Sequence, residues 1–188
     1  MSLLREYIRM LLKESIDPKI MSMIDKAEQW GFIVRVEPYL ISVEDRHGER
    51  VAYVGFDDAG DFGPCLGAKR VTGSRADQAY GLGPLAYDVA IEVTGGLMSD
   101  RTEVSGEAEA VWYHYMKKRS DVQADQLDIT KDFEEPQLTP DYKKDDCDQL
   151  PAHDLYGSGW HGTGLSQKIS KAGTPVMDEL RKRGMLQE

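Results

Sequence analysis

A glycine-rich turn between an apolar segment and a helical pattern places the strongest constraint on this chain. The turn reads Gln78-Ala79-Tyr80-Gly81-Leu82-Gly83-Pro84. Residues 66–74 before it predict a strand, and Pro84 suits the first position of a helix, where its missing N–H would have no partner. This order offers backbone N–H groups and the positive end of a helix dipole to an anion, typically a phosphate. The alternative is a tight turn that binds nothing. The residues on either side of the turn are needed to choose between these two interpretations.

The length and composition of the chain indicate one domain with a sizeable core. The chain has 188 residues, of which 40% are apolar, and a net charge of −10. Such an acidic surface argues against nucleic-acid binding but leaves room for one local basic pocket. Cys65 and Cys147 lack metal-site or disulfide-framework spacing, which favours a reducing compartment. No apolar run approaches membrane-spanning length, so we expect a soluble, cytoplasmic protein without a membrane partner.

Residues 1–16 form a separate unit. An apolar stripe recurs at helical spacing and consists of Leu4, Tyr7, Ile8, Leu11 and Leu12. Asp17-Pro18 then breaks the pattern. The segment resembles the capsid-targeting peptides of large tailed phages, which are cut after a Leu-x-Glu sequence such as Leu12-Lys13-Glu14. That resemblance implies a capsid partner and packaging in the virion; the alternative is a helix that packs on the domain or on another protein.

Residues 17–120 read as the core domain. We expect a helix over 19–30 ended by Gly31, strands over 32–36, 39–44 and 49–56, and the strand at 66–74 before the glycine turn. The helix after the turn buries Leu85, Val89 and Val93, and its Asp88 and Glu92 are expected on a solvated side. Gly95-Gly96 ends this helix, a short strand over 97–98 follows, and Ser105 is a suitable N-cap for the next helix.

This order of elements resembles the GNAT acyltransferase superfamily, whose phosphate motif Gln/Arg-x-x-Gly-x-Gly/Ala is matched by Gln78, Gly81 and Gly83. The resemblance implies an α/β (α+β) fold, with a mixed, mainly antiparallel central sheet flanked by helices, and acetyl-CoA as the cofactor. The cofactor-binding residues that it implies are Val71, Gly73, Gln78, Ala79, Tyr80, Gly81, Leu82, Gly83, Ser105 and Trp112.

The sequence matches the catalytic residues of the family less well than its cofactor-binding residues. The family places Asn, Ala and Tyr on a later helix, and the corresponding residues here are Ser105, Ala108 and Trp112. An indole N–H cannot protonate the departing thiolate at neutral pH. Tyr115, on the same face as Trp112, is therefore the preferred catalytic acid, with Tyr113 beside it. Candidates for the general base are Glu44, Asp57 and Asp58, although each is better explained as a surface carboxylate.

Residues 121–188 change character. They begin as a long, irregular acidic connector interrupted by prolines, and continue as a C-terminal segment expected to pack on the core. A metal site is less favoured there than a solvated loop; its residues would be Asp145, Asp146, Cys147, Asp148 and His153. Thr174 and Pro175 open a last helix, which Gly184 ends.

The resemblance therefore implies an acetyl-CoA-dependent N-acyltransferase with an unidentified amine acceptor. The acidic surface favours a basic acceptor, either a small molecule or a protein lysine. The alternative is a non-catalytic GNAT-like phage protein that acts by binding, either in the virion or on a host protein in the host cytoplasm.

Overall fold

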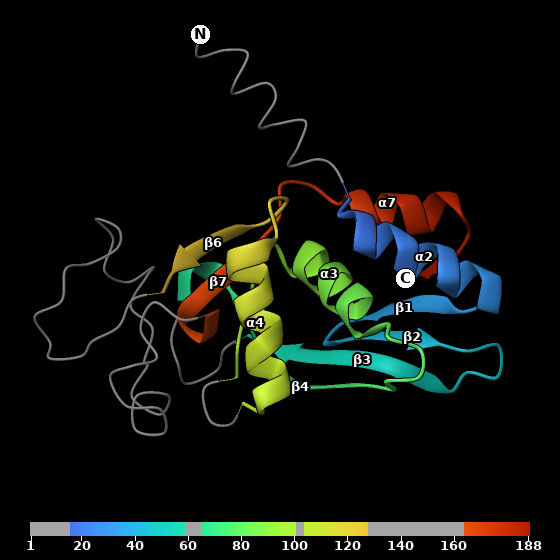
Figure 1. Cartoon of the computed structure of the whole chain (residues 1–188), viewed down its shortest axis with the longest axis horizontal. Helices are drawn as coiled ribbons and strands as arrows, with labels where there is room; N and C mark the ends of the chain where they lie inside the picture. The colour runs from blue at the N-terminus through green and yellow to red at the C-terminus, as the bar shows by residue number, and fades with distance from the viewer. Residues whose placement is uncertain (1–15, 59–64, 101–103, 128–163) are drawn as a thin grey trace, which may run out of the picture.

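The computed structural model describes residues 16–58, 65–100, 104–127 and 164–188 (Figure 1). These residues form a curled, mostly antiparallel sheet of eight strands with four helices, which confirms a mixed α/β (α+β) class. The elements follow in the order α2 (Pro18–Trp30), β1 (Ile33–Glu37), β2 (Leu40–Glu44), β3 (Arg50–Asp57), β4 (Lys69–Ala76), α3 (Gly83–Thr94), β5 (Leu97–Met98), α4 (Gly106–Lys118), β6 (Gln123–Gln126), β7 (Gln167–Ser170), α7 (Pro175–Lys182) and β8 (Leu186–Gln187).

The strand order is β6-β7-β5-β4-β3-β2-β1-β8. Strands β1 to β4 form an antiparallel meander, whereas β5 runs parallel to β4 and β8 runs parallel to β1. Residues 121–188, expected as a connector and a packing segment, thus supply strands at both edges of the sheet (Figure 1). The N-terminal segment 1–15 and most of the acidic connector, 128–163, lie outside the described residues.

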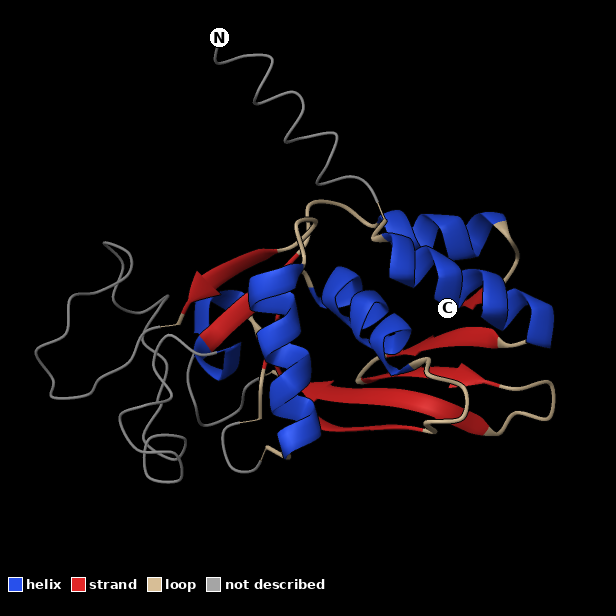
Figure 2. Cartoon of the chain, viewed as in Figure 1, coloured by secondary structure: helices blue, strands red, loops and turns tan. Residues whose placement is uncertain are grey.

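One face of the meander packs against the helices and forms part of the core. Ile41, Val43 and Val54 are fully buried, and the helix α3 packs over β2 and β3. Figure 2 shows α2, α3 and α7 together on this face of the strands. The hairpin between β2 and β3 is fixed by Asp45, whose carboxylate accepts the N–H groups of His47 and Glu49.

Helix α3 is the centre of the core. Every residue from Leu85 to Glu92 is buried, because the sheet covers one side of the helix and α2 and α7 pack on others. The prediction that Asp88 and Glu92 are solvated is therefore wrong: they are 0% and 7% exposed. Val93, expected in the buried line, is 36% exposed. Gly95 ends the helix as predicted, at a φ of 71° that favours glycine.

Strand β4 begins later than the predicted 66–74 and separates from its neighbour. It pairs with β5 only through Lys69 and Arg70, opposite Leu97 and Met98. The pairing of β4 with β3 skips Thr72, because Gly55 faces Gly73 and Phe56 faces Val71, which makes a one-residue bulge. Beyond Arg70, one edge of β4 therefore has no strand beside it within the described part of the chain.

Candidate functional site

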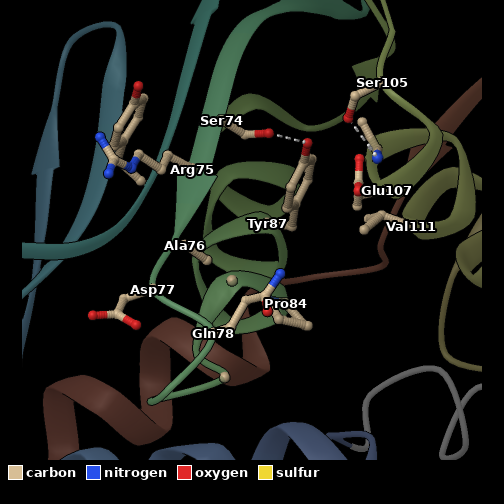
Figure 3. A pocket seen from close by; sticks show the side chains of 14 residues that line it. Ser74, Arg75, Ala76, Asp77, Gln78, Pro84, Tyr87, Ser105, Glu107 and Val111 are labelled. Atoms are coloured by element: carbon tan, nitrogen blue, oxygen red, sulfur yellow. Dashed lines mark hydrogen bonds between the residues drawn. The ribbon is translucent and has the colours of Figure 1, made fainter.

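The open edge of β4 forms one wall of a cleft. The opposite wall is the first half of α4, and the start of α3 closes one end (Figure 3). This outer cavity has a volume of about 500 Å³. Its lining comes from three separate stretches of the chain and includes Ser74, Arg75, Gln78, Gly81, Gly83, Tyr87, Ser105 and Ala108.

A second, inner cavity of about 250 Å³ continues the cleft along β4. The two cavities share Ser74, Tyr87, Ser105 and Ala108. The inner one is also lined by Val71, Thr72, Gly73, Asp100, Val104 and Trp112. The result is one groove that runs from the glycine turn along the unpaired edge of β4.

The glycine turn is held by Asp77. Its carboxylate accepts the N–H of Ala79 at 2.9 Å, and its backbone carbonyl accepts those of Tyr80 and Gly81. Gly81 has a φ of 66°, which a side chain would strain. Within the described residues, the hydrogen bonds of the turn leave the N–H groups of Leu82 and Gly83 unused. Those two groups belong to the positive end of α3.

Gly83 lies where the start of α3 approaches β4 closely. A Cβ atom built on Gly83 would lie 3.0 Å from the Cβ of Ala76, a contact so tight that β4 or α3 would have to shift by a few tenths of an ångström. The start of α4 lines the same cavity, where Ser105 caps the helix by accepting the N–H of Ala108 at 3.3 Å. Two helix N-termini therefore meet at the outer cavity, although Asp77 and Glu107 also line it.

The predicted cofactor residues divide into two groups. Those that line the cleft are Val71, Gly73, Gln78, Gly81, Gly83, Ser105 and Trp112. The other three belong to the turn but not to the lining of these cavities: Ala79 donates to Asp77, Leu82 is fully buried, and Tyr80 packs against Trp30 and Phe32.

The predicted catalytic tyrosines lie elsewhere. Tyr115 is 1% exposed and donates its hydroxyl hydrogen to the carboxylate of Asp88 at 2.6 Å. Burial, reinforced by the charge of Asp88, raises the pKa of Tyr115 well above 10.0. Tyr113 is 53% exposed. Neither is among the described residues that line the two cavities.

Tyr87 is the tyrosine in the cleft, and the sequence analysis missed it. It lines both cavities, is 5% exposed, and donates to the Oγ of Ser74 at 2.9 Å (Figure 3). Burial raises its pKa above 10.0 despite this hydrogen bond, so the phenol is protonated at neutral pH. The signal available in the sequence was a lone aromatic residue in the first turns of the helix that follows the glycine turn.

The three candidate bases are engaged in ion pairs. Asp57 pairs with Arg70 at 2.5 Å, and Asp58 pairs with Lys69. Burial alone would raise the pKa of Glu44, but the hydrogen bonds from Ser42 and Arg35 outweigh it and hold the pKa below 4.5. The structure gives each carboxylate a structural partner.

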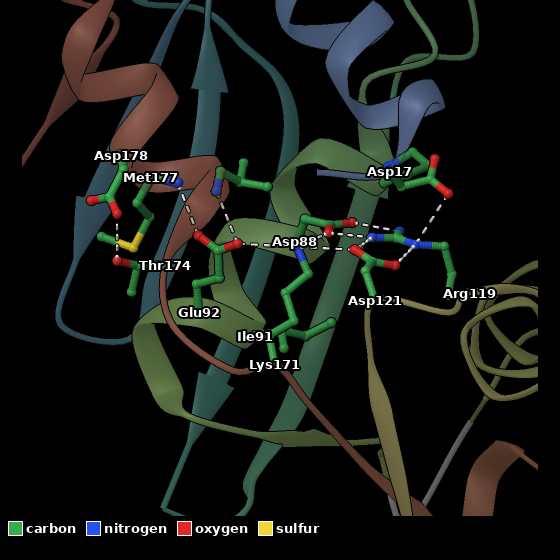
Figure 4. A network of polar contacts seen from close by, with 12 residues as sticks. Asp17, Asp88, Ile91, Glu92, Arg119, Asp121, Lys171, Thr174, Met177 and Asp178 are labelled. Atoms are coloured by element: carbon green, nitrogen blue, oxygen red, sulfur yellow. Dashed lines mark hydrogen bonds and ion pairs between the residues drawn. The ribbon is translucent and has the colours of Figure 1, made fainter. Parts of the chain in front are cut away.

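A second polar cluster lies inside the core, and its residues line neither of the two cavities (Figure 4). It consists of Asp88, Glu92, Tyr115, Arg119, Asp121 and Lys171, which come from α3, α4, the loop before β6 and the loop after β7. We refer to it as the buried ionic cluster.

The buried ionic cluster satisfies nearly every donor it contains. Arg119 forms a bidentate pair with Asp88, at 2.9 and 2.7 Å, and another with Asp121, at 2.7 and 2.6 Å. Lys171 contacts Asp88 and, at 3.0 Å, Glu92. Glu92 also accepts the first two N–H groups of α7, from Val176 and Met177.

Opposite pKa shifts distinguish the two acids of this cluster on α3. Burial would raise the pKa of Asp88, but Arg119 and Lys171 overcome it and hold the pKa below 3.8. For Glu92, burial prevails over Lys171 and the α7 N–H groups, and the pKa is raised above 4.5. The charged carboxylate of Asp88 therefore bridges Arg119 and Lys171.

Comparison with protein-family models, with curated proteins and with solved structures finds no match to this chain. Among the described residues, no helix is both long and apolar enough to cross a membrane, and no group of three or more His, Cys, Asp or Glu side chains is placed to hold a metal ion. The sequence candidates for a metal site, residues 145–148 and 153, lie outside the described residues.

Proposed function

We propose that the cleft binds acetyl-CoA and that the protein is a GNAT-like N-acyltransferase acting on an amine. The observation that carries this proposal is the continuity between the glycine turn and the open edge of β4. One end of the groove offers the start of α3, where Gly83 lines the cavity and its N–H forms no hydrogen bond with a described residue, and the rest offers strand backbone along residues 71–76.

Coenzyme A has the chemistry that such a groove accepts. Its pyrophosphate suits the N-terminus of α3, where N–H groups and the helix dipole favour an anion. Its extended arm carries amide groups, which pair with an open strand edge as another strand would. The thioester then lies in the inner cavity, near the bulge at Thr72 and close to Trp112.

In the proposed reaction, the amine nitrogen attacks the thioester carbonyl, the C–N bond forms and the C–S bond breaks. A base takes the proton that the amine loses, and an acid protonates the thiolate. Tyr87 is the residue that we assign to the acid, because it lines both cavities and is protonated at neutral pH. Tyr115, the expected acid, is committed to Asp88.

A second candidate function is binding without transfer, as in a non-catalytic GNAT-like phage protein that acts in a virion or on a host protein. Two observations favour it: Trp112 lines the inner cavity at the position where the family has its tyrosine, and Tyr115 is buried. The N-terminal segment that resembles a capsid-targeting peptide lies outside the described residues.

Ligand-dependent thermal unfolding tests the cofactor. At about 100 times the dissociation constant, acetyl-CoA adds about 2.7 kcal/mol to the free energy of unfolding. That raises the Tm of a chain of this size by about 5–10 °C. Gly81→Ala strains the turn at its positive φ and should reduce the shift, whereas Gly48→Ala, which introduces the same strain in the hairpin between β2 and β3, is the matched control. No shift at millimolar acetyl-CoA rejects the proposal.

Product analysis then separates the two candidates. The protein is incubated with acetyl-CoA and basic amines, such as a polyamine, an aminoglycoside or a lysine peptide. Free thiol and acetylated amine in equal amounts support the transferase. Binding of acetyl-CoA without acetylation of any of these amines supports the non-catalytic protein.

A further inference from the structure

A hollow of about 700 Å³ adjoins the outer cavity at the end of β4. It shares Tyr53, Arg75, Ala76, Asp77 and Gln78 with that cavity and adds Arg50 and Val51. Figure 3 shows Arg75 and Asp77 pointing away from Tyr87, whereas Ser74 points toward it. The hollow therefore continues the cleft past the end of β4, next to the glycine turn.

Two arginines reach this hollow because of the sheet register. Arg75 lies opposite Tyr53 on the neighbouring strand. On β3, the pairing skips Val51, so Arg50 lies opposite Glu44. The two cations therefore flank a hollow in a protein whose net charge is −10.

Neither arginine has its charge fully neutralised by the protein. Arg75 is exposed and forms no ion pair with another described residue. Arg50 is 48% exposed at its side chain, and its ion pairs are long, 3.5 Å to Glu37 and 3.7 Å to Glu44. One carboxylate, Asp77, lines the hollow as well, and one of its oxygens is occupied by the N–H of Ala79.

We propose that Arg50 and Arg75 bind the 3′-phosphate of coenzyme A and select the cofactor against its dephosphorylated form. This inference rests on the proposed function. In coenzyme A, the ribose that carries the 3′-phosphate is bonded to the pyrophosphate on the side away from the thioester arm. With the pyrophosphate at the start of α3 and the arm along β4, this ribose therefore lies at the end of the cleft where the hollow begins. Arginine matches a phosphomonoester through paired N–H donors. Gln78, at the boundary of the two cavities, lines the path between the two phosphate sites.

The test measures the affinities of the full chain for coenzyme A and for dephospho-coenzyme A by calorimetry. Coenzyme A should bind about tenfold more tightly than the dephosphorylated form. Arg75→Ala should weaken coenzyme A about tenfold and leave dephospho-coenzyme A within about twofold, so that the two affinities converge. Arg75→Lys should restore part of the difference, and Arg50→Ala should act in the same direction as Arg75→Ala.

Lys117→Ala is the control, since it removes one positive charge from the exposed last turn of α4, at the opposite end of that helix from the cleft. It should change neither affinity by more than about twofold. Equal affinity of the unmodified protein for the two ligands overturns the inference and leaves the proposed function standing. A similar loss for both ligands in Arg75→Ala overturns it too, because the arginine would then not read the 3′-phosphate. If neither ligand binds, the proposed function is wrong and the inference falls with it.

Discussion

The buried ionic cluster and the cleft contain similar residue types, but these are paired with one another in the cluster and left open in the cleft. Both contain a buried tyrosine that donates a hydrogen bond, Tyr115 to Asp88 and Tyr87 to Ser74. In the cluster, the arginine and the carboxylates satisfy one another, and the charges join four parts of the chain. In the cleft, neither the side chain of Arg75 nor the N–H of Gly83 has an ion-pair or hydrogen-bond partner among the described residues. Satisfied polar groups hold the fold, whereas open ones are available to a ligand.

The largest expected effect comes from the cluster. Asp88→Asn removes the charge that Arg119 and Lys171 share and leaves two buried cations poorly compensated. We expect the free energy of unfolding to fall by about 3–5 kcal/mol, measured by urea denaturation. Asp178→Asn, at an exposed ion pair on α7, is the control and should change it by no more than about 0.5 kcal/mol. A loss below about 1 kcal/mol for Asp88→Asn would contradict the structural role of the cluster.

The two tyrosines give the sharpest contrast. Tyr115→Phe deletes a hydrogen bond to a charged, buried acceptor, so stability should fall by about 1.5–3 kcal/mol while the stabilisation by acetyl-CoA stays unchanged. Tyr87→Phe deletes a neutral hydrogen bond and should cost about 1 kcal/mol, but acetyl transfer should fall about a hundredfold. Thermal unfolding and turnover of both variants are compared. Reversal of the pattern, with turnover lost only in Tyr115→Phe, would restore Tyr115 as the acid.

A smaller effect is expected when a negative charge that lines the cleft is removed. Asp77→Asn keeps a side-chain oxygen for the N–H of Ala79 but removes a negative charge beside the glycine turn. We expect acetyl-CoA to bind about threefold more tightly, by calorimetry, and the gain to shrink as salt is added. Asp125→Asn, on β6, is a control with the same change of charge. Unchanged affinity in both variants would mean that no anion lies near this turn.

The smallest effect concerns Glu44, on the sheet next to the hollow. Its pKa is held below 4.5, so the charged form stabilises the fold above that pH and the contribution is lost as the pH falls through the lowered pKa. Glu44→Gln should therefore cost about 1 kcal/mol or less at neutral pH, and the difference from the unmodified protein should shrink at pH 3. A difference that is the same at both pH values would show that the hydrogen bonds, rather than the charge, stabilise this part of the sheet.

The parts of the fold that local chemistry specifies were predictable from the sequence. Gly31, Gly81 and Gly95 all have a positive φ and sit where the chain was expected to turn or a helix to end. Ser105 caps α4 as expected. The burial of Asp88 was not predictable, because its partners Arg119 and Lys171 are distant in sequence and nothing local to α3 indicates them. The role expected for Tyr115 failed for the same reason, since a helical face shows burial but not the group on the other side.

The two edges of the sheet have a consequence for how the chain folds as it is synthesised. β1 is bordered on its outer side by β8, through Val34 and Leu186, and β5 is bordered by β7, through Leu97 and Ile169. Both partners are made long after the strands that they cover. Until residues 164–187 have left the ribosome, a nascent chain with a complete meander carries unpaired strand edges on both sides, and Lys171 is not yet present to pair with Asp88. Closure of the sheet and neutralisation of the core charge are thus coupled late events in folding, separated from the early hairpins by the time needed to translate the acidic connector.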